Sequence, residues 1–299
     1  MNNLVMIIGG GPAGMAAALQ LKRQGRESLL FESQSLGSLL RNAQLVENYL
    51  GFPDGISGFE LMERFKRQVL SWEIRVEYKT VTSLSYGSEE QQFKLKTADS
   101  MEYLGDIVVV ASGTKPTPLP LVESLSAEDR LRVFYDVVSL IEVEDRHIVV
   151  IGAGDVAHDY ALNLARLNQV WLVQKGEASR ALPILQKRTS RHPRIERFDN
   201  TLLREIGPGG SRALSLTFDR DGQRGSLACD YLVCAIGRET QKDFYSPDLF
   251  GEEGALVNMG RLHLAGDVQN GSLRQVSIAA GDGIAAAMKI DCFFREGEL

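Results

Sequence analysis

Two glycine-rich loops in one chain constrain its fold more than any other feature. The first is Gly9-Gly10-Gly11-Pro12-Ala13-Gly14, and the second, about 140 residues later, is Gly152-Ala153-Gly154-Asp155-Val156-Ala157. Each loop follows an apolar run typical of a buried strand, residues 4–8 and 148–151, and each opens a stretch typical of a helix. A strand, a glycine-rich turn and a helix N-terminus together form a phosphate-binding arrangement, so the chain is predicted to bind two dinucleotides.

The first loop has the spacing of a complete dinucleotide fingerprint. Gly9 permits the tight turn, Gly11 lets the backbone approach a pyrophosphate, and Gly14 lets the helix pack closely on the strand. A second apolar run, residues 28–31, ends in Glu32, whose carboxylate can accept hydrogen bonds from ribose hydroxyls. The predicted binding residues here are Gly9, Gly11, Pro12, Ala13, Gly14 and Glu32.

The second loop repeats this pattern with an alanine in the third small position. A helix is expected over residues 156–167 and a strand over residues 170–173, which ends in Gln174 and Lys175 instead of an acid. A cation at this place suits the 2′-phosphate of NADPH better than the free hydroxyl of NADH, and Arg180 is a second candidate. The other interpretation is that both cations are solvated surface charges. The predicted contacts are Gly152, Gly154, Asp155, Val156, Lys175 and Arg180.

The order of the remaining segments predicts one domain inserted in another. A buried strand at residues 106–113 leads into prolines at positions 116, 118 and 120, where the chain is expected to leave the first domain. A similar run at residues 231–237 ends the inserted domain, and the chain then returns to the first domain. The predicted class is α/β, with two Rossmann-like dinucleotide-binding domains of three layers each. Residues 1–115 and 241–299 are predicted to form one discontinuous domain, expected to bind FAD, and residues 116–240 the inserted domain, expected to bind NAD(P).

Composition excludes several classes of function. The net charge of −6 argues against nucleic acid as a partner, and no apolar run approaches the roughly 20 residues of a membrane span. The three cysteines have neither a disulfide framework nor metal-ligand spacing, so no metal site and a cytoplasmic location are expected. The four histidines have no telling neighbours, and no catalytic residue is assigned, because a flavin itself carries hydride chemistry.

Together, these motifs resemble the low-molecular-weight thioredoxin reductase family of FAD- and NAD(P)-binding oxidoreductases. Residues 46–52 are similar to its VENYPGF segment beside the flavin, residues 266–268 to its GDV motif, and residues 274–283 to its RQ…AGxG helix start. The resemblance implies that Asp267 bonds the ribityl chain, that the helix starting near Gln275 points its N-terminus at the flavin pyrimidine, and that the protein is a homodimer. The further contacts implied are Leu40, Asn48, Val81, Gly113, Gly266, Arg274, Gln275 and Val276 for FAD, and Ile236 and Gly237 for NAD(P).

The chain departs from the family in three places. The family has a Cys-x-x-Cys just before the second loop, whereas residues 132–138 contain no cysteine, so the usual disulfide relay to thioredoxin is not expected. Cys229 and Cys234 are expected to pack in a core. The NADPH motif HRRxxxR corresponds to residues 174–180, where one basic position is lost, and residues 36–39 lack the usual Gly-Gly pair near the flavin.

A sister group, the thioredoxin-reductase-like ferredoxin/flavodoxin–NADP reductases, also lacks the cysteine pair. Residues 134–135 and 154–159 resemble that group, but its C-terminal extension, which carries an aromatic residue over the flavin, has no full counterpart here. Phe293 and Phe294 either cover the flavin of a partner subunit or, as we favour, cap a core. The basic run at residues 187–194 either docks an acidic carrier such as ferredoxin or flavodoxin or, as we favour, is a solvated loop.

Three functional hypotheses follow from the sequence. The first is an NAD(P)H-dependent flavoenzyme that transfers hydride between the nicotinamide and flavin N5 and serves ferredoxin, flavodoxin or a small acceptor. The second is a flavoprotein with a decayed nicotinamide site that takes electrons from another protein. The third is a non-enzymatic flavin sensor or interaction protein.

Overall fold

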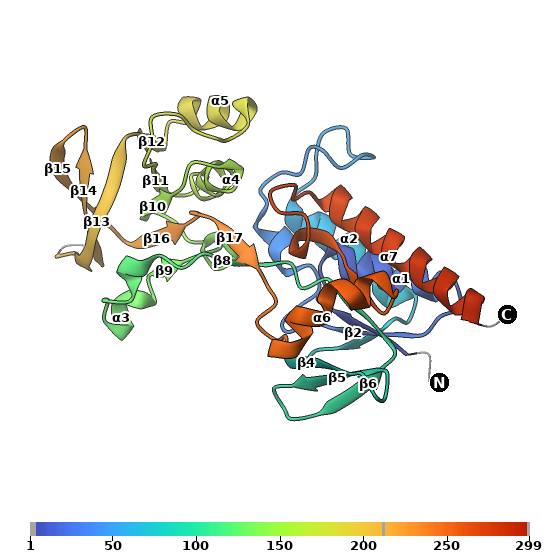
Figure 1. Cartoon of the computed structure of the whole chain (residues 1–299). Helices are drawn as coiled ribbons and strands as arrows, with labels where there is room; N and C mark the ends of the chain where they lie inside the picture. Colours follow the sequence, from blue (N-terminus) through green and yellow to red (C-terminus); the bar gives the residue numbers. More distant parts are fainter. Residues whose placement is uncertain (1–3, 211–212, 298–299) are drawn as a thin grey trace. The chain divides into compact units, whose positions relative to one another are not determined.

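The protein, for which we have a computed structural model, is described over residues 4–210 and 213–297 (Figure 1). It forms two compact units: unit 1 contains residues 1–41, 47–115 and 240–299, and unit 2 contains residues 42–46 and 116–239. The expected continuous range 1–115 therefore needs a correction at residues 42–46. The Asn42 side-chain oxygen accepts hydrogen bonds from the N–H groups of Val137 and Val138 at 2.9 and 3.2 Å, and Asp159 Oδ2 accepts one from the Gln44 N–H at 3.1 Å. These bonds attach the short loop to unit 2.

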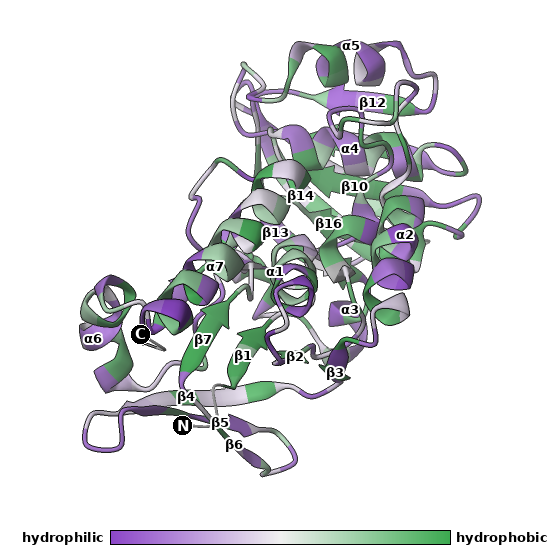
Figure 2. Cartoon of the chain, turned by 90° about the vertical axis from the view of Figure 1, so that its right-hand side faces the viewer, coloured by the Kyte–Doolittle hydropathy of each residue, from purple (hydrophilic) through white to green (hydrophobic). Residues whose placement is uncertain are grey.

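Unit 1 is built on a parallel sheet of five strands. In the order β18-β7-β1-β2-β3, these strands are Leu262–Leu264, Ile107–Val110, Val5–Ile8, Ser28–Phe31 and Arg75–Glu77. The central strands are apolar at every position, because both faces of the sheet are covered. Figure 2 shows β1 and β7 in the hydrophobic colour along their length.

The two faces of this sheet are covered by different kinds of layer. Helices α1 (Pro12–Arg23) and α7 (Val276–Gly297) lie side by side on one face, with α2 (Gly58–Ser71) next to α1 (Figure 1). The other face packs against α6 (Pro247–Asn258) and an antiparallel sheet. That sheet consists of β4 (Val81–Gly87), β5 (Gln92–Thr97) and β6 (Glu102–Gly105).

The run at residues 76–85 divides between two sheets, because β3 pairs with β2 in the parallel sheet and β4 pairs with β5. Phe294 is buried in the core beneath α1 and α7, and Phe293 packs against the same core, so their predicted capping role is confirmed.

Unit 2 repeats the three-layer plan. Its parallel sheet has the order β12-β11-β10-β16-β9, with strands Ile195–Phe198, Gln169–Val173, His147–Ile151, Tyr231–Cys234 and Val133–Phe134. Helix α4 (Asp155–Leu164) covers one face, and α5 (Pro183–Arg191) packs on α4. The opposite face packs against the antiparallel strands β13 (Thr201–Pro208), β14 (Leu214–Arg220) and β15 (Gln223–Cys229).

The basic run at residues 187–194 is not the loop that we expected. Helix α5 begins at Pro183, a favourable first helical residue, and continues to Arg191. Its buried Thr189 contacts α4, so tertiary contact keeps this polar segment helical.

The chain also passes between the units through β8 (Thr114–Pro116) and β17 (Arg238–Thr240), which pair with each other. The remaining short helices are η1 (Ser38–Asn42), η2 (Pro120–Val122), α3 (Ala127–Arg130), η3 (Val138–Leu140) and η4 (Gly266–Val268). Among the helices within residues 4–210 and 213–297, none has both the length and the apolar composition needed to cross a membrane.

Candidate dinucleotide sites

Two glycines of the first loop are required by the backbone itself. Gly9 has φ of 108°, and a Cβ placed on it would lie 2.3 Å from the Ala111 carbonyl oxygen. A Cβ on Gly14 would lie 1.9 Å from the Gly9 carbonyl oxygen, closer than any real contact. These two positions therefore let α1 start immediately after β1 and pack against the turn.

Gly11 has no such requirement, which makes it informative about a ligand. Its φ of −74° suits any residue, and, apart from Gly11 itself and its two chain neighbours, no heavy atom lies within 4 Å of the position a Cβ would take. Gly11 is the N-cap of α1, and no acidic side chain stands in the first turn of that helix. The loop therefore leaves open space beside unpaired N–H groups, which fits the pyrophosphate of a dinucleotide.

Glu32 is held at the end of β2 by the first loop. Its side chain is buried, Oε2 accepts a hydrogen bond from the Gly10 N–H at 2.8 Å, and Oε1 accepts one from the Gln34 N–H at 2.9 Å. A carboxylate has about four acceptor positions, so the group keeps capacity for ribose hydroxyls.

The C-terminal motif lies against the first loop. Gly266 has φ of 77°, and a Cβ on it would lie 2.9 Å from Ala13 Cβ, so Asp267 in η4 follows directly beside α1. The turn is held by Asp282 of α7, whose Oδ2 accepts hydrogen bonds from the Gly266 N–H at 3.0 Å and from Asn270 Nδ2 at 2.5 Å. Sequence reasoning gave Asp282 no role.

The structure also joins Asn48 to Gln275, because Asn48 Nδ2 donates a hydrogen bond to Gln275 Oε1 at 2.6 Å. Both side chains were predicted contacts. The remaining predicted residues of unit 1 lie on separate elements: Pro12 at the start of α1, Leu40 in η1, Val81 at the start of β4, Gly113 with φ of 67° before β8, and Arg274 and Val276 at the start of α7.

In the second loop, as in the first, one glycine is required by the backbone and another leaves open space. A Cβ on Gly152, which has φ of 154°, would lie 2.4 Å from the Ala235 carbonyl oxygen. Gly154 is the N-cap of α4, and nothing lies within 4 Å of its Cβ position. This loop therefore also has room for a phosphate, although Asp155 adds a negative charge in the first turn of the helix.

The segment after β11 folds back onto this second loop. The Arg180 N–H donates to the Ala153 carbonyl oxygen at 2.7 Å, and the Leu182 N–H donates to Asp155 Oδ1 at 2.7 Å. Lys175 and Arg180 are exposed, whereas Gln174 is buried, and its amide donates to the carbonyl oxygens of Gly176 and Glu177, both at 3.2 Å.

Two predicted residues of unit 2 follow β16. Ile236 is half-buried, and Gly237 has φ of 145°, with its Cβ position 3.2 Å from Thr117 Oγ1. Val156 lies in the first turn of α4 and is 44% exposed.

The stretch that lacks the family's cysteine pair is occupied by structural contacts. Val137 is fully buried, and the Tyr135 hydroxyl accepts a hydrogen bond from the Leu119 N–H at 3.0 Å. Cys229 and Cys234 are buried in the core between the two sheets of unit 2, which confirms their predicted packing role. Burial raises the pKa of the Cys234 thiol to about 12. Cys292 is an exposed residue of α7 in unit 1, and the described residues contain no cluster of side chains suited to a metal ion.

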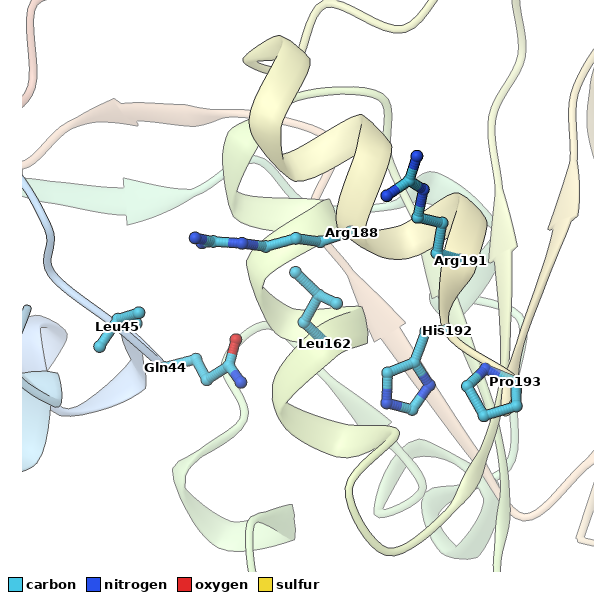
Figure 3. A pocket seen from close by; sticks show the side chains of 7 residues that line it. All are labelled: Gln44, Leu45, Leu162, Arg188, Arg191, His192 and Pro193. Carbon is cyan, nitrogen blue, oxygen red and sulfur yellow. The ribbon is translucent and has the colours of Figure 1, made fainter. Parts of the chain in front are cut away.

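A shallow basic cavity of about 390 Å³ lies in unit 2 at the end of α5 (Figure 3). Arg188 and Arg191 project from α5, and Gln44 and Leu45 belong to the loop that unit 2 binds. The other lining residues are Leu162, His192 and Pro193. Burial and the neighbouring Arg194 lower the pKa of His192.

The two units define a protein with two dinucleotide-binding folds, and comparison with known proteins gives the family. Residues 3–283 match the family described as pyridine nucleotide-disulphide oxidoreductase, and the chain belongs to it. A thioredoxin reductase of Listeria innocua is 30% identical over 303 residues, covering 98% of this chain and 94% of the relative. Thioredoxin reductase 1, mitochondrial, of Arabidopsis thaliana is 30% identical, covering 99% and 84%.

The solved structures agree with this assignment. The crystal structure of Lactococcus lactis thioredoxin reductase matches with a TM-score of 0.86 at 27% identity, covering 98% of this chain and 99% of that one. The predicted resemblance to thioredoxin reductases and the predicted α/β class with two dinucleotide-binding domains are confirmed. Thioredoxin reductases use FAD and NADPH. The open positions at Gly11 and Gly154 fit the phosphate groups of these cofactors.

Proposed function

We propose that this protein is an FAD-dependent oxidoreductase that passes electrons from NAD(P)H to an external acceptor without a protein disulfide. The observation that carries the proposal is the stretch at residues 132–138, which has no cysteine and whose backbone N–H groups at Val137 and Val138 are bound to Asn42. The remaining thiols do not form a Cys-x-x-Cys pair, because Cys229 and Cys234 are buried in the core of unit 2 and the exposed Cys292 is a single free cysteine.

In this proposal, unit 1 binds FAD. The N-terminus of α1 faces the pyrophosphate at Gly11, Glu32 accepts hydrogen bonds from ribose hydroxyls, and Asp267 binds the ribityl chain. The N-terminus of α7 at Val276 contributes a positive dipole end beside the flavin ring. The bound flavin supplies the redox chemistry, so the protein groups bind and orient it and need no acid–base residue.

Unit 2 binds the nicotinamide nucleotide in the same proposal. Gly154 leaves space for the pyrophosphate, and the exposed cations Lys175 and Arg180 meet a 2′-phosphate. Because Gly176 stands where a third cation would strengthen this contact, the preference for NADPH over NADH is modest. Lys175→Ala and Arg180→Ala should each raise the KM for NADPH and leave that for NADH nearly unchanged.

The basic cavity of unit 2 is the proposed docking site for an acidic electron carrier of the ferredoxin or flavodoxin kind. Lys187, Arg188, Arg191 and Arg194 carry four positive charges within eight residues of a chain whose net charge is −6.

Anaerobic stopped-flow spectroscopy tests the main proposal. Purified protein should contain FAD, and NADPH should bleach its absorbance at a rate that supports turnover with an external acceptor. Thioredoxin should not be reduced. The variant in which all three cysteines are replaced (Cys229→Ala, Cys234→Ala, Cys292→Ser) is the matched control and should bleach and turn over like the wild type. Loss of turnover in this folded variant would show that a thiol takes part and would overturn the proposal.

The docking site has its own test. Arg191→Glu reverses one charge at the rim of the cavity and should lower the association rate of an acidic carrier without changing the rate at which NADPH bleaches the flavin. The effect should fade at high salt, because electrostatic steering is screened. Arg204→Glu, which changes an exposed cation on the antiparallel sheet of unit 2, is the control. Equal effects of the two substitutions would contradict a specific docking site.

A second function remains to be tested because Asp155 introduces an anionic group at the N-terminus of α4. In this alternative, the nicotinamide site has decayed and a protein donor reduces the flavin. Failure of both NADPH and NADH to bleach a flavin that reduced ferredoxin does bleach would favour it over the main proposal. A flavin that neither kind of donor bleaches would favour a sensor.

A further inference from the structure

A buried histidine connects three elements around the second glycine loop. His158 of α4 is completely buried, with Nε2 2.9 Å from Ser179 Oγ and Nδ1 2.9 Å from Thr189 Oγ1 of α5. Ser179 Oγ lies 2.9 Å from the carbonyl oxygen of Ala153, the middle residue of the Gly152-Ala153-Gly154 turn. A line of polar contacts therefore runs from α5 through α4 to the loop.

The same carbonyl oxygen holds the residue that follows Ser179. The Arg180 N–H donates to Ala153 O at 2.7 Å, so two consecutive residues of the segment after β11 are attached to one point of the loop. Gln186 of α5 supports the segment further by donating its amide to the Ala181 carbonyl oxygen at 2.6 Å. The exposed Arg180 side chain therefore starts from a backbone whose place depends on Ser179.

The protonation state of the His158 imidazole determines the directions of these hydrogen bonds. A neutral ring has one N–H. With the proton on Nε2, the ring donates to Ser179, whose hydroxyl then donates to Ala153 O. In this form the Thr189 hydroxyl must donate to Nδ1 instead of to the carbonyl oxygens of Leu185 and Gln186, which lie at 3.1 and 3.0 Å. With the proton on Nδ1, Ser179 must donate to Nε2 and loses Ala153. Burial and the nearby Arg197 lower the pKa of His158, although Asp155 and Asp199 oppose this, so the neutral ring is the form at pH 7.

We propose that His158 is a positioning residue for the 2′-phosphate of NADPH, which places Arg180 beside the phosphate loop through Ser179 without touching the nucleotide. The inference rests on the proposed binding of a nicotinamide nucleotide by unit 2. The nucleotide would bind at the open position beside Gly154, whereas His158 is completely buried and cannot contact it.

Two small ligands separate this role from general support of the fold. The probe 2′,5′-ADP carries the 2′-phosphate, and 5′-AMP lacks it, so the ratio of their dissociation constants in titration calorimetry measures recognition of that phosphate alone. His158→Leu should reduce the preference for 2′,5′-ADP by about fivefold, with 5′-AMP affinity changed less than about twofold. Ser179→Ala should do the same at a half-buried site where misfolding is not expected.

Three further variants make the test specific. Thr189→Val removes the contact on the far side of the ring with little change of shape, so it should lower the melting temperature but keep the ratio. His158→Gln retains an amide that can reach Ser179 and should restore part of the preference lost in His158→Leu. In an Arg180→Ala background, His158→Leu should have no further effect on the ratio, because the two residues act through one cation.

Each outcome decides the matter. An unchanged ratio in folded His158→Leu or Ser179→Ala would overturn the inference, as would an equal loss of both ligands or full additivity with Arg180→Ala. If the wild type binds neither ligand, the proposed nicotinamide function of unit 2 fails and the role of His158 fails with it. If the wild type binds both equally, only the 2′-phosphate role is overturned.

Discussion

The two glycine loops have the same backbone geometry, but the helices that follow them differ in charge. In each loop, the first glycine is required by its positive φ and by a close carbonyl oxygen, at Ala111 in unit 1 and Ala235 in unit 2. Helix α1 then has no acidic residue, whereas α4 has two, Asp155 and Asp159. The two loops therefore share one backbone geometry, with open space at Gly11 and Gly154, while the charges on the helices differ between them.

The strand that follows each loop differs in the same way. In unit 1, Glu32 accepts two backbone N–H groups and keeps acceptor capacity. In unit 2, Gln174 donates to two carbonyl oxygens and is buried. A carboxylate at the first position is therefore stabilised by its surroundings, whereas one at the second would face oxygen atoms. The same loop motif is thus followed by hydrogen-bond acceptors in unit 1 and by a hydrogen-bond donor in unit 2.

The largest effect should come from adding a methyl group to the first loop at Gly14. Gly14→Ala places Cβ 1.9 Å from the Gly9 carbonyl oxygen, so α1 must move away from β1. We expect a stability loss of about 3 kcal/mol and no retained FAD. Gly11→Ala is the matched control, because its Cβ enters open space. It should cost less than about 1 kcal/mol in the apoprotein but weaken FAD binding at least about tenfold.

Urea unfolding of the apoproteins and fluorescence titration with FAD measure both quantities. If Gly11→Ala bound FAD like the wild type, the open space beside it would not be the phosphate site. If Gly14→Ala were as stable as the wild type, the close packing of α1 on the turn would be wrong.

Exchange of the two strand-end residues should have the next largest effect. Glu32→Gln replaces a charged acceptor of two N–H groups by an amide, and hydrogen bonds to charged groups are worth roughly 1.5–3 kcal/mol. Gln174→Glu places a carboxylate against the Gly176 and Glu177 carbonyl oxygens and should destabilise unit 2 by a similar amount. Thermal unfolding of each variant checks this, and a stable Gln174→Glu enzyme with a new preference for NADH would contradict our account of that position.

A smaller effect concerns Asp159, the second acid of α4. Burial raises its pKa to about 6 from an ordinary value near 3.8, with the Gln44 N–H acting in the opposite direction. A raised folded-state pKa means that the ionised form opposes folding, so stability should fall as the pH rises from about 4 to 6. Asp159→Asn keeps an oxygen for the Gln44 N–H and removes the charge.

The stability gained by Asp159→Asn should therefore be near zero at pH 4 and on the order of 1–2 kcal/mol at pH 7. Urea unfolding of both proteins across this range measures the difference at each pH. A gain that stays constant with pH would show that the carboxylate is not responsible.

Local patterns account for the parts of the fold that could be predicted. Apolar runs and glycine spacing predict both glycine loops, the strand that ends before Glu32 and the buried strand of unit 2 that precedes Gly152. Ser57 and Glu60 have the spacing of a helix N-cap, and the Glu60 N–H does bond Ser57 Oγ, so α2 was recognisable from the sequence although it was not predicted.

Contacts between distant segments account for what could not be predicted. Asp282 is far along the chain from the turn at Gly266 that it holds, and Asn42 lies 95 residues before its partner Val137. His158 looked unremarkable in sequence because its partners, Ser179 and Thr189, are on other elements. No short-range sequence pattern predicts such pairs, so the roles of these residues follow only from the three-dimensional structure.

The smallest effect should come from the charge of Asp155 itself. A carboxylate in the first turn stabilises a helix by about 0.3–1 kcal/mol, but it repels a pyrophosphate bound at the same end. Asp155→Asn retains an oxygen for the Leu182 N–H, so the segment after β11 should keep its place. We expect ADP to bind unit 2 about two- to fivefold more tightly, with the difference disappearing in high salt because screening removes the repulsion. Calorimetric titration at two salt concentrations measures this difference. Weaker binding by the variant would mean that Asp155 supports the nucleotide site by accepting the hydrogen bond from Leu182. The negative charge of Asp155 would then not be what distinguishes α4 from α1 in nucleotide binding.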